Sequence, residues 1–259
     1  DNTMRRHRGS ISAVMDELIE SIQGEFDVEK RHEVVREIDR ILAEETPYVL
    51  LWHIDYVRLA EAHSGDIPRS VPPDYIWGDA LSAVDAAAPD LRVINLETSI
   101  TADGTPEPKG INYRMHPDNT QAIAAFKPDA CVLANNHVAD WGPEGVTDTL
   151  DALAAVDLAN VGAGRNAEEA ARPLTLEAEG ARLRLFAVAC PSSGTPEHWA
   201  AGPDASGVNV LPDTSETSFE RLARNIAAHS GPEDIVMLSI HWGGNWGYEV
   251  PERHRAFAP

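Results

Sequence analysis

The sequence predicts a layered α/β sandwich, in which buried strands alternate with amphipathic helices. Two observations carry this prediction. Apolar runs rich in branched side chains occur at 91–96, 130–134 and 235–240, and each ends abruptly in polar residues. Helical patterns lie between these runs. A chain of 259 residues with 43% hydrophobic residues is long enough for one large α/β domain or two small ones.

The individual elements follow in chain order from residue periodicity. Helices are expected at 75–88, 119–126, 145–156 and 218–229. A short strand is expected at 158–161, directly before a Gly-Ala-Gly turn. The runs 174–178 and 182–189 predict a β-hairpin around Glu179 and Gly180, because a turn signal separates two strand-like runs.

Residues 1–54 have a different pattern from the rest of the chain. Asp27 is a suitable N-cap for a helix that ends before Pro47, and 48–54 is strand-like. This helix and strand resemble the C-terminal region of dipeptide-type extracellular solute-binding proteins. We therefore expect two pieces, 1–54 and 55–259, joined near residue 55. A divergent N-terminal extension is the alternative.

Charge and composition exclude some classes of function. A net charge of −21 and a pI near 4.7 argue against nucleic-acid binding, which needs a basic face. No apolar run is long enough to cross a bilayer, and no signal peptide is visible in the sequence, which leaves a removed leader open. The sequence leaves a cytoplasmic and an envelope-associated location open. Cys131 and Cys190 lie in apolar runs, which predicts small buried side chains rather than ligands or a disulfide.

Three predicted strands end in side chains that can bind metal. Glu97 follows the first strand, Asn136 and His137 follow the second in the stretch CVLANNHVADWG, and His241 follows the third. Because open α/β sheets build their sites at the carboxyl ends of strands, we expect these side chains to converge. Carboxylate, amide and imidazole groups suit divalent cations such as Mn²⁺ and Zn²⁺. Local capping by Glu97 and a backbone-bonded core histidine at His241 are the structural alternatives.

Longer phrases resemble one family in their order and spacing. They are VINLET, GINYRMHP, NNHVADWG, GAGR and SIHWGGNWGYE, which begin at residues 93, 110, 135, 162 and 239. Over about residues 55–259 the chain resembles the CapA family of capsule or poly-γ-glutamate biosynthesis proteins, which have a calcineurin-like metallophosphoesterase fold. The family's opening Gly-Asp strand and its final Gly-His-x-x-His type motif are not found here. The resemblance therefore implies a sandwich that is incomplete at both ends.

The resemblance also implies roles for individual residues. Asn136 and His241 match metal ligands, Glu97 matches a ligand or a base that orients water, and His137 matches a histidine that contacts the substrate. The implied cofactors are divalent metal ions (Mn, Zn or Fe), whose affinity the missing ligands would weaken or abolish. In the Gly/Pro-rich loop Lys109, Arg114 and His116 are candidates for binding an anionic or polyglutamate-type substrate.

The implied function is capsule or poly-γ-glutamate biosynthesis, with membrane partners through the capsule machinery and an open oligomeric state. Whether the chain is an active hydrolase stays open at this point. A non-catalytic scaffold of the same fold and a peptide-binding fragment of an ABC transporter are the alternatives. Bound metal would separate an enzyme from a scaffold.

Overall fold

The computed structural model describes residues 30, 33, 71–178, 180–245 and 249–257. The chain divides into two units, 1–69 and 70–259, and the elements given below all belong to the second. Of the predicted N-terminal helix only Lys30 and Glu33 are described, and both are helical. The predicted strand at 48–54 and the join near residue 55 lie outside the described residues.

The second unit is an α/β structure with two three-stranded sheets. In the first sheet, β4 (Ala130–Val132) lies between β1 (Val93–Asn95) and β5 (Asn160–Val161), and all pairings are parallel. In the second, β8 (Ala181–Ala189) pairs antiparallel with β7 (Leu174–Ala178) and parallel with β10 (Asp234–His241). These strands confirm the predicted strands and the hairpin at 174–189.

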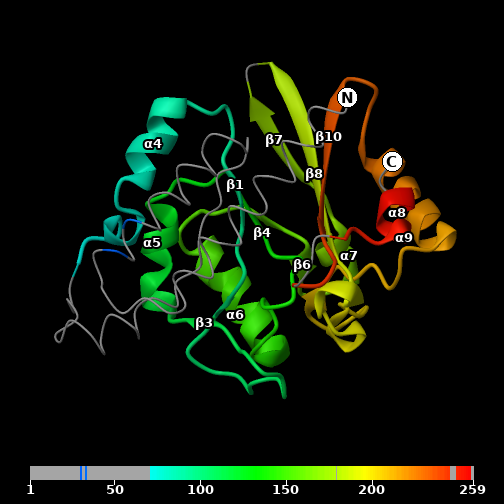
Figure 1. Cartoon of the computed structure of the whole chain (residues 1–259), viewed down its shortest axis with the longest axis horizontal. Coiled ribbons are helices and arrows are strands. Elements are labelled where there is room, and N and C mark those ends of the chain that lie inside the picture. The colour runs from blue at the N-terminus through cyan, green and yellow to red at the C-terminus, as the bar shows by residue number, and fades with distance from the viewer. Residues whose placement is uncertain (1–29, 31–32, 34–70, 179, 246–248, 258–259) are drawn as a thin grey trace. The chain divides into compact units, whose positions relative to one another are not determined.

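Two short strand pairs and a set of helices complete the described part. The short pairs are β2 (Ser99–Ile100) with β3 (Arg114–Met115), and β6 (Ala163–Gly164) with β9 (Gly207–Val208). The α-helices are α4 (Ala80–Ala87), α5 (Thr120–Ala124), α6 (Gly142–Ala154), α7 (Ala167–Ala171), α8 (Glu216–His229) and α9 (Glu252–Phe257). Four 3-10 helices are η1 (Tyr75–Trp77), η2 (Pro117–Asn119), η3 (Pro191–Ser193) and η4 (Glu197–Trp199). In Figure 1, α8 and α9 lie beside β10, whereas α5 and α6 lie on the side of β1 and β4.

Helix boundaries differ from the predicted ones for local reasons. The helix expected at 75–88 is divided into η1 and α4, because Gly78 adopts a φ of +49° that breaks the helical path. Helix α6 begins at Gly142, earlier than expected, with Pro143 in its first turn. Helix α8 begins after Ser215, whose hydroxyl accepts a hydrogen bond from the backbone N–H of Ser218 at 3.3 Å.

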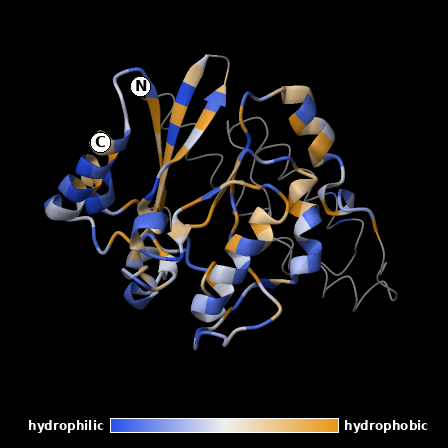
Figure 2. Cartoon of the chain, turned by 180° about the vertical axis from the view of Figure 1, so that it is seen from behind, coloured by the Kyte–Doolittle hydropathy of each residue, from blue (hydrophilic) through white to orange (hydrophobic). Residues whose placement is uncertain are grey.

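The main core lies around the parallel sheet. All of β4 is buried, together with Ile94, Leu133, Val146 and Leu153. A smaller apolar cluster joins β8 to α8 and α9. Figure 2 shows hydrophobic residues along the strands and alternating polar and apolar residues on the helices. Cys131 and Cys190 are both buried and free, as predicted, and burial raises the pKa of these thiols to about 12 and about 11.

One glycine allows the two sheets to approach closely. Gly162 follows β5 with a φ of +93°, and a Cβ there would lie 2.6 Å from the Cβ of Ala134 and 2.8 Å from that of Ala187. Ala134 follows β4 and Ala187 belongs to β8, so the contact is where the sheets meet. Because β1 is parallel to β4 and β10 is parallel to β8, this contact lies near the carboxyl ends of strands from both sheets.

Candidate functional site

Asn135 ties together the turns that follow β1 and β4. Its side chain is fully buried. The Nδ2 group donates to the Leu96 carbonyl at 2.9 Å and to Asn95 Oδ1 at 3.0 Å. The Oδ1 atom accepts from the backbone N–H groups of His137 and Val138 at 3.0 and 2.9 Å. This amide is therefore occupied in shaping the turn, which leaves the next residue, Asn136, to face the site.

Glu97, Asn136 and His241 converge although they follow three different strands. His241 Nε2 lies 3.1 Å from Asn136 Oδ1 and 3.8 Å from Glu97 Oε1. Asn95 Nδ2 donates to Glu97 Oε2 at 2.9 Å and orients that carboxylate. The structure thus brings together the carboxylate, amide and imidazole that the sequence proposed as metal ligands.

The electrostatics around His241 favour its neutral form. Burial is the largest cause and lowers the pKa of this imidazole from 6.5. The charge of Glu97 acts in the opposite direction, and His137 adds to the lowering. A neutral imidazole is the form that binds a metal ion, so burial prepares His241 for that role.

His137 lies next to this group and is held by three neighbours, one of which is Lys109, with Nζ 3.4 Å from Nδ1. Its Nδ1 atom is 2.7 Å from Asp140 Oδ2, and its ring stacks on Tyr113 with the centroids 4.0 Å apart. The described residues offer no hydrogen-bond partner to its Nε2 atom. The ring is therefore fixed through one nitrogen, and the other is available for chemistry.

Asp140 organises this side of the site. Its side chain is 0% exposed and accepts hydrogen bonds from Lys109 Nζ at 2.5 Å and from the Tyr113 N–H at 2.6 Å. With His137 it thus has three hydrogen-bonding neighbours. A carboxylate engaged in this way positions other groups, and it has little capacity left to bind a metal ion.

The three predicted substrate-binding residues have different environments. Lys109 Nζ donates to the Asn136 carbonyl as well as to Asp140, and it lies 5.0 Å from the centre of the Trp199 ring. Arg114 is exposed and stacks its guanidinium over Trp141 at 4.1 Å. His116 caps η2 by accepting from the Asp118 N–H at 3.3 Å. Of the three, Lys109 alone contacts the described residues of the site.

The loop between β2 and β3 is the Gly/Pro-rich loop of the sequence analysis, but its contacts with this network were not predicted. The Glu107 N–H donates to the Asp140 carbonyl at 2.8 Å, and His198 Nε2 lies 3.1 Å from Glu107 Oε2. Asn112 Nδ2 donates to the Glu107 carbonyl at 2.8 Å. The sequence signal for this loop was the phrase GINYRMHP, but loop contacts follow no periodicity, so Tyr113 was missed as a neighbour of His137.

The donor set fits one divalent cation. Glu97, Asn136 and His241 offer a carboxylate oxygen, an amide oxygen and an imidazole nitrogen, a combination that suits Mn²⁺, Zn²⁺ or Fe²⁺. In the described part of the chain, no three or more His, Cys, Asp or Glu side chains form a group that could hold a metal ion.

Comparison with known proteins assigns the family. A model of the family described as "Bacterial capsule synthesis protein PGA_cap" matches residues 34–259. The chain belongs to this family. The match begins before residue 55, so it includes part of the segment that the sequence analysis assigned to a solute-binding-like piece.

Individual relatives are consistent with this membership. The chain is 44% identical over 206 residues to a Mycobacterium tuberculosis protein named probable polyglutamine synthesis accessory protein, a match that covers 78% of the chain and 54% of the relative. It is 28% identical to the capsule biosynthesis protein CapA of Bacillus anthracis, over 58% of the chain and 35% of the relative. A Bacillus subtilis protein named PGA biosynthesis protein CapA is 29% identical, over 58% of the chain and 37% of the relative. The chain thus spans about half the length, or less, of the curated relatives it matches.

Membership of the PGA_cap family supports the capsule interpretation and gives no support to the peptide-binding alternative. Within the described part of the chain, no helix combines the length and the apolar content that crossing a bilayer requires.

Proposed function

We propose that this PGA_cap protein acts in capsule or poly-γ-glutamate synthesis through a metal-assisted, hydrolase-type site at Glu97, Asn136 and His241. The contact between Asn136 Oδ1 and His241 Nε2 carries the proposal, because it joins ligand-type side chains from two separate sheets. The names of the relatives support the capsule and polyglutamate association. The proposed substrate is an anionic polymer or precursor of the polyglutamate type.

The finer part of the fold proposal is a calcineurin-like sandwich. In such an arrangement two sheets face each other and the site lies at the carboxyl ends of their strands. The close contact at Gly162 and the position of His241 at the end of β10 support this arrangement. Helices α8 and α9, which pack on β8 and β10, would form an outer layer.

Each side chain has a defined role in the proposed reaction. Glu97, Asn136 and His241 would hold a divalent cation, which when bound polarises a phosphate and promotes ionisation of water. With a proton on both ring nitrogens, His137 presents Nε2–H to the oxygen of the leaving group, where it donates a hydrogen bond or that proton. Asp140 accepts a hydrogen bond from Nδ1 and fixes the ring orientation. Lys109 positions Asp140 and the Asn136 backbone, so it contributes indirectly.

Manganese titration by calorimetry tests the metal site, and hydrolysis of bis(p-nitrophenyl) phosphate tests the activity. His241→Ala should weaken Mn²⁺ binding about 10–100-fold or more, because it removes a ligand rather than an outer partner. His137→Ala should retain Mn²⁺ binding but lower turnover by about 10²–10⁴-fold, the usual contribution of a general acid. His229→Ala, on α8, is the matched histidine control and should change neither.

Two outcomes would contradict the proposal. Equal Mn²⁺ affinity in the wild-type chain, His241→Ala and Glu97→Gln would show that the metal binds elsewhere. Tight binding without turnover, unchanged by His137→Ala, would favour a non-catalytic scaffold that keeps the fold.

A further inference from the structure

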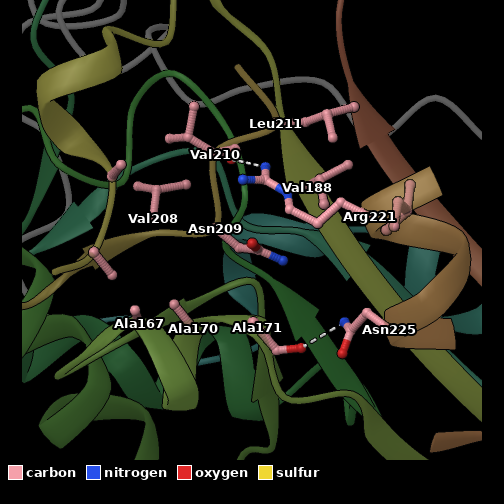
Figure 3. Close-up of a pocket in the computed structure, with 13 residues that line it drawn as sticks. Ala167, Ala170, Ala171, Val188, Val208, Asn209, Val210, Leu211, Arg221 and Asn225 are labelled. Atoms are coloured by element: carbon pink, nitrogen blue, oxygen red, sulfur yellow. Dashed lines mark hydrogen bonds between the residues drawn. The ribbon is translucent and has the colours of Figure 1, made fainter. Parts of the chain in front are cut away.

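A cavity lies between α7, β9 and α8. Its volume is about 390 Å³, within the range of about 300–1,000 Å³ that is typical of small-ligand pockets. Its lining does not include Glu97, Asn136, His137 or His241, so it is separate from the candidate site. Figure 3 shows Arg221 and Asn225 extending from α8 and Asn209 lying between them and the opposite wall.

Most of the cavity wall is apolar and built from small side chains. Alanines come from α7 and from residues 200–201, and the larger apolar members are Val188, Val208, Val210, Leu211 and Leu222. Small side chains leave space, and branched ones offer surface to a short aliphatic chain. Such a wall suits a ligand that contains a few methylene groups. The polar groups of that ligand must be recognised by other residues of the cavity.

Arg221 places a positive charge at this wall. Its Nη2 atom makes one long hydrogen bond, 3.4 Å, to the Val210 carbonyl, and no described carboxylate forms an ion pair with it. The nearby carboxylate of Asp213 attracts this guanidinium electrostatically, but its hydrogen bonds come from the Ser215 and Ser218 hydroxyls at 2.6 and 2.5 Å. The guanidinium therefore keeps donors that a carboxylate ligand can use.

Two amide oxygens complete the polar set. Asn225 donates its Nδ2 to the Ala171 carbonyl at 3.2 Å, and Asn209 donates its Nδ2 to the Ala187 carbonyl at 2.8 Å. Each Oδ1 atom has no hydrogen-bond donor among the described residues, so it can accept from a ligand. Arg221 and Asn225 are four residues apart on α8 and so share one face of that helix.

We propose that this cavity binds a short carboxylate that also carries an N–H group, of the glutamyl type. The carboxylate meets Arg221, the N–H meets an asparagine oxygen, and the methylene groups lie against the alanine and valine wall. The requirement for a carboxylate with an N–H follows from the cavity alone. The choice of a glutamyl unit rests on the proposed function. In that function, this cavity would bind a segment of the polymer that lies away from the candidate site.

Calorimetric titration of the whole chain with γ-glutamylglutamate tests the proposal. Arg221→Met keeps most of the aliphatic stem and should weaken binding about tenfold or more, the value of a charge-assisted hydrogen bond. Asn225→Leu should also weaken it. Arg224→Met is the matched control, since Arg224 pairs with Glu220 at 3.7 Å and does not line the cavity. The triamide of the dipeptide, in which all three carboxylates are replaced by uncharged amides, should bind the wild-type chain more weakly.

The outcomes separate this proposal from the proposed function. Binding that survives His241→Ala but not Arg221→Met supports the cavity, whatever the result of the manganese experiment. Binding lost in His241→Ala and retained in Arg221→Met would place the dipeptide at the metal-type site and overturn the inference. Undetectable binding to the wild-type chain at millimolar dipeptide would overturn it as well.

Discussion

Replacing Asp140 by alanine tests whether this carboxylate organises the site. The wild-type side chain is 0% exposed and interacts with the Lys109 ammonium, the Tyr113 N–H and the His137 ring. The substitution removes the carboxylate partner of the Lys109 ammonium, which keeps the Asn136 carbonyl as an acceptor, and it removes the acceptor of the Tyr113 N–H. Removing one partner of a buried ion pair typically costs about 3–5 kcal/mol of folding stability. Lys109 is 24% exposed, so water relieves part of this penalty, and we expect about 3 kcal/mol.

Urea unfolding followed by tryptophan fluorescence measures this change as a shift of the midpoint at constant slope. Asp151→Ala is the matched control, because Asp151 pairs with Arg165 on the surface, where the side chains are 66% and 45% exposed. Such a pair contributes about 0–1 kcal/mol. Combining Asp140→Ala with Lys109→Met should show a coupling of about 1 kcal/mol or more, since each removes the other's partner.

A loss below about 1 kcal/mol in Asp140→Ala, similar to that in the control, would refute the reasoning. It would mean that water replaces the carboxylate easily and that the network contributes little to the fold. An additive double mutant would lead to the same conclusion for the Lys109 contact alone.

Two further predictions concern the frame around the site. Gly162→Ala should destabilise the fold by about 3 kcal/mol or more, because its Cβ would overlap Ala134 and Ala187 at a positive φ. Gly180 also has a positive φ but has open space around it, so Gly180→Ala should cost about 1 kcal/mol by the same urea measurement. Equal losses in the two variants would contradict the close-approach argument. Hydrogen bonding to Arg182, the largest cause, lowers the pKa of Asp234 from 3.8 to about 2. Its stabilising contribution should therefore be complete above pH 3.8 and be lost as the pH falls through about 2. The difference in free energy of unfolding between the wild-type chain and Asp234→Asn should therefore decrease as the pH falls through that window. The control Asp204→Asn, at an exposed loop position, should have the same pH dependence as the wild type.

The sequence was sufficient to predict the longer elements but not the short ones. Strand β8 and helix α8 have runs of nine and 14 residues in which the apolar pattern is clear. Strands β2, β3, β6 and β9 have two residues each, too few for any period to appear. They form only where tertiary contacts bring a partner strand alongside, so single-sequence periodicity cannot indicate them.

The candidate site also has a part that the sequence could predict and a part that it could not. Glu97, Asn136 and His241 were predicted to converge because each follows a strand. For Glu97 and Asn136 the reason holds, because β1 and β4 are parallel neighbours, whereas His241 ends a strand of the second sheet, which approaches the first at Gly162. The environment of Lys109 was not predictable, since it depends on a loop that folds back over Asp140. An exposed lysine and a lysine bonded to a buried carboxylate have the same sequence signature.

This arrangement of Lys109 has a consequence for the charge at the proposed metal site. The ammonium is engaged by Asp140 and by the Asn136 carbonyl, so its strongest ion pair is with a carboxylate that has no ligand role here. Had Lys109 paired with Glu97, it would have neutralised the carboxylate among the three proposed ligands and opposed cation binding. Asp140 therefore has two effects, since it orients His137 and also keeps a positive charge bound away from Glu97. Asp140→Ala should for this reason weaken Mn²⁺ binding in addition to lowering stability. Unchanged Mn²⁺ affinity in a folded Asp140→Ala chain would limit its role to orienting His137.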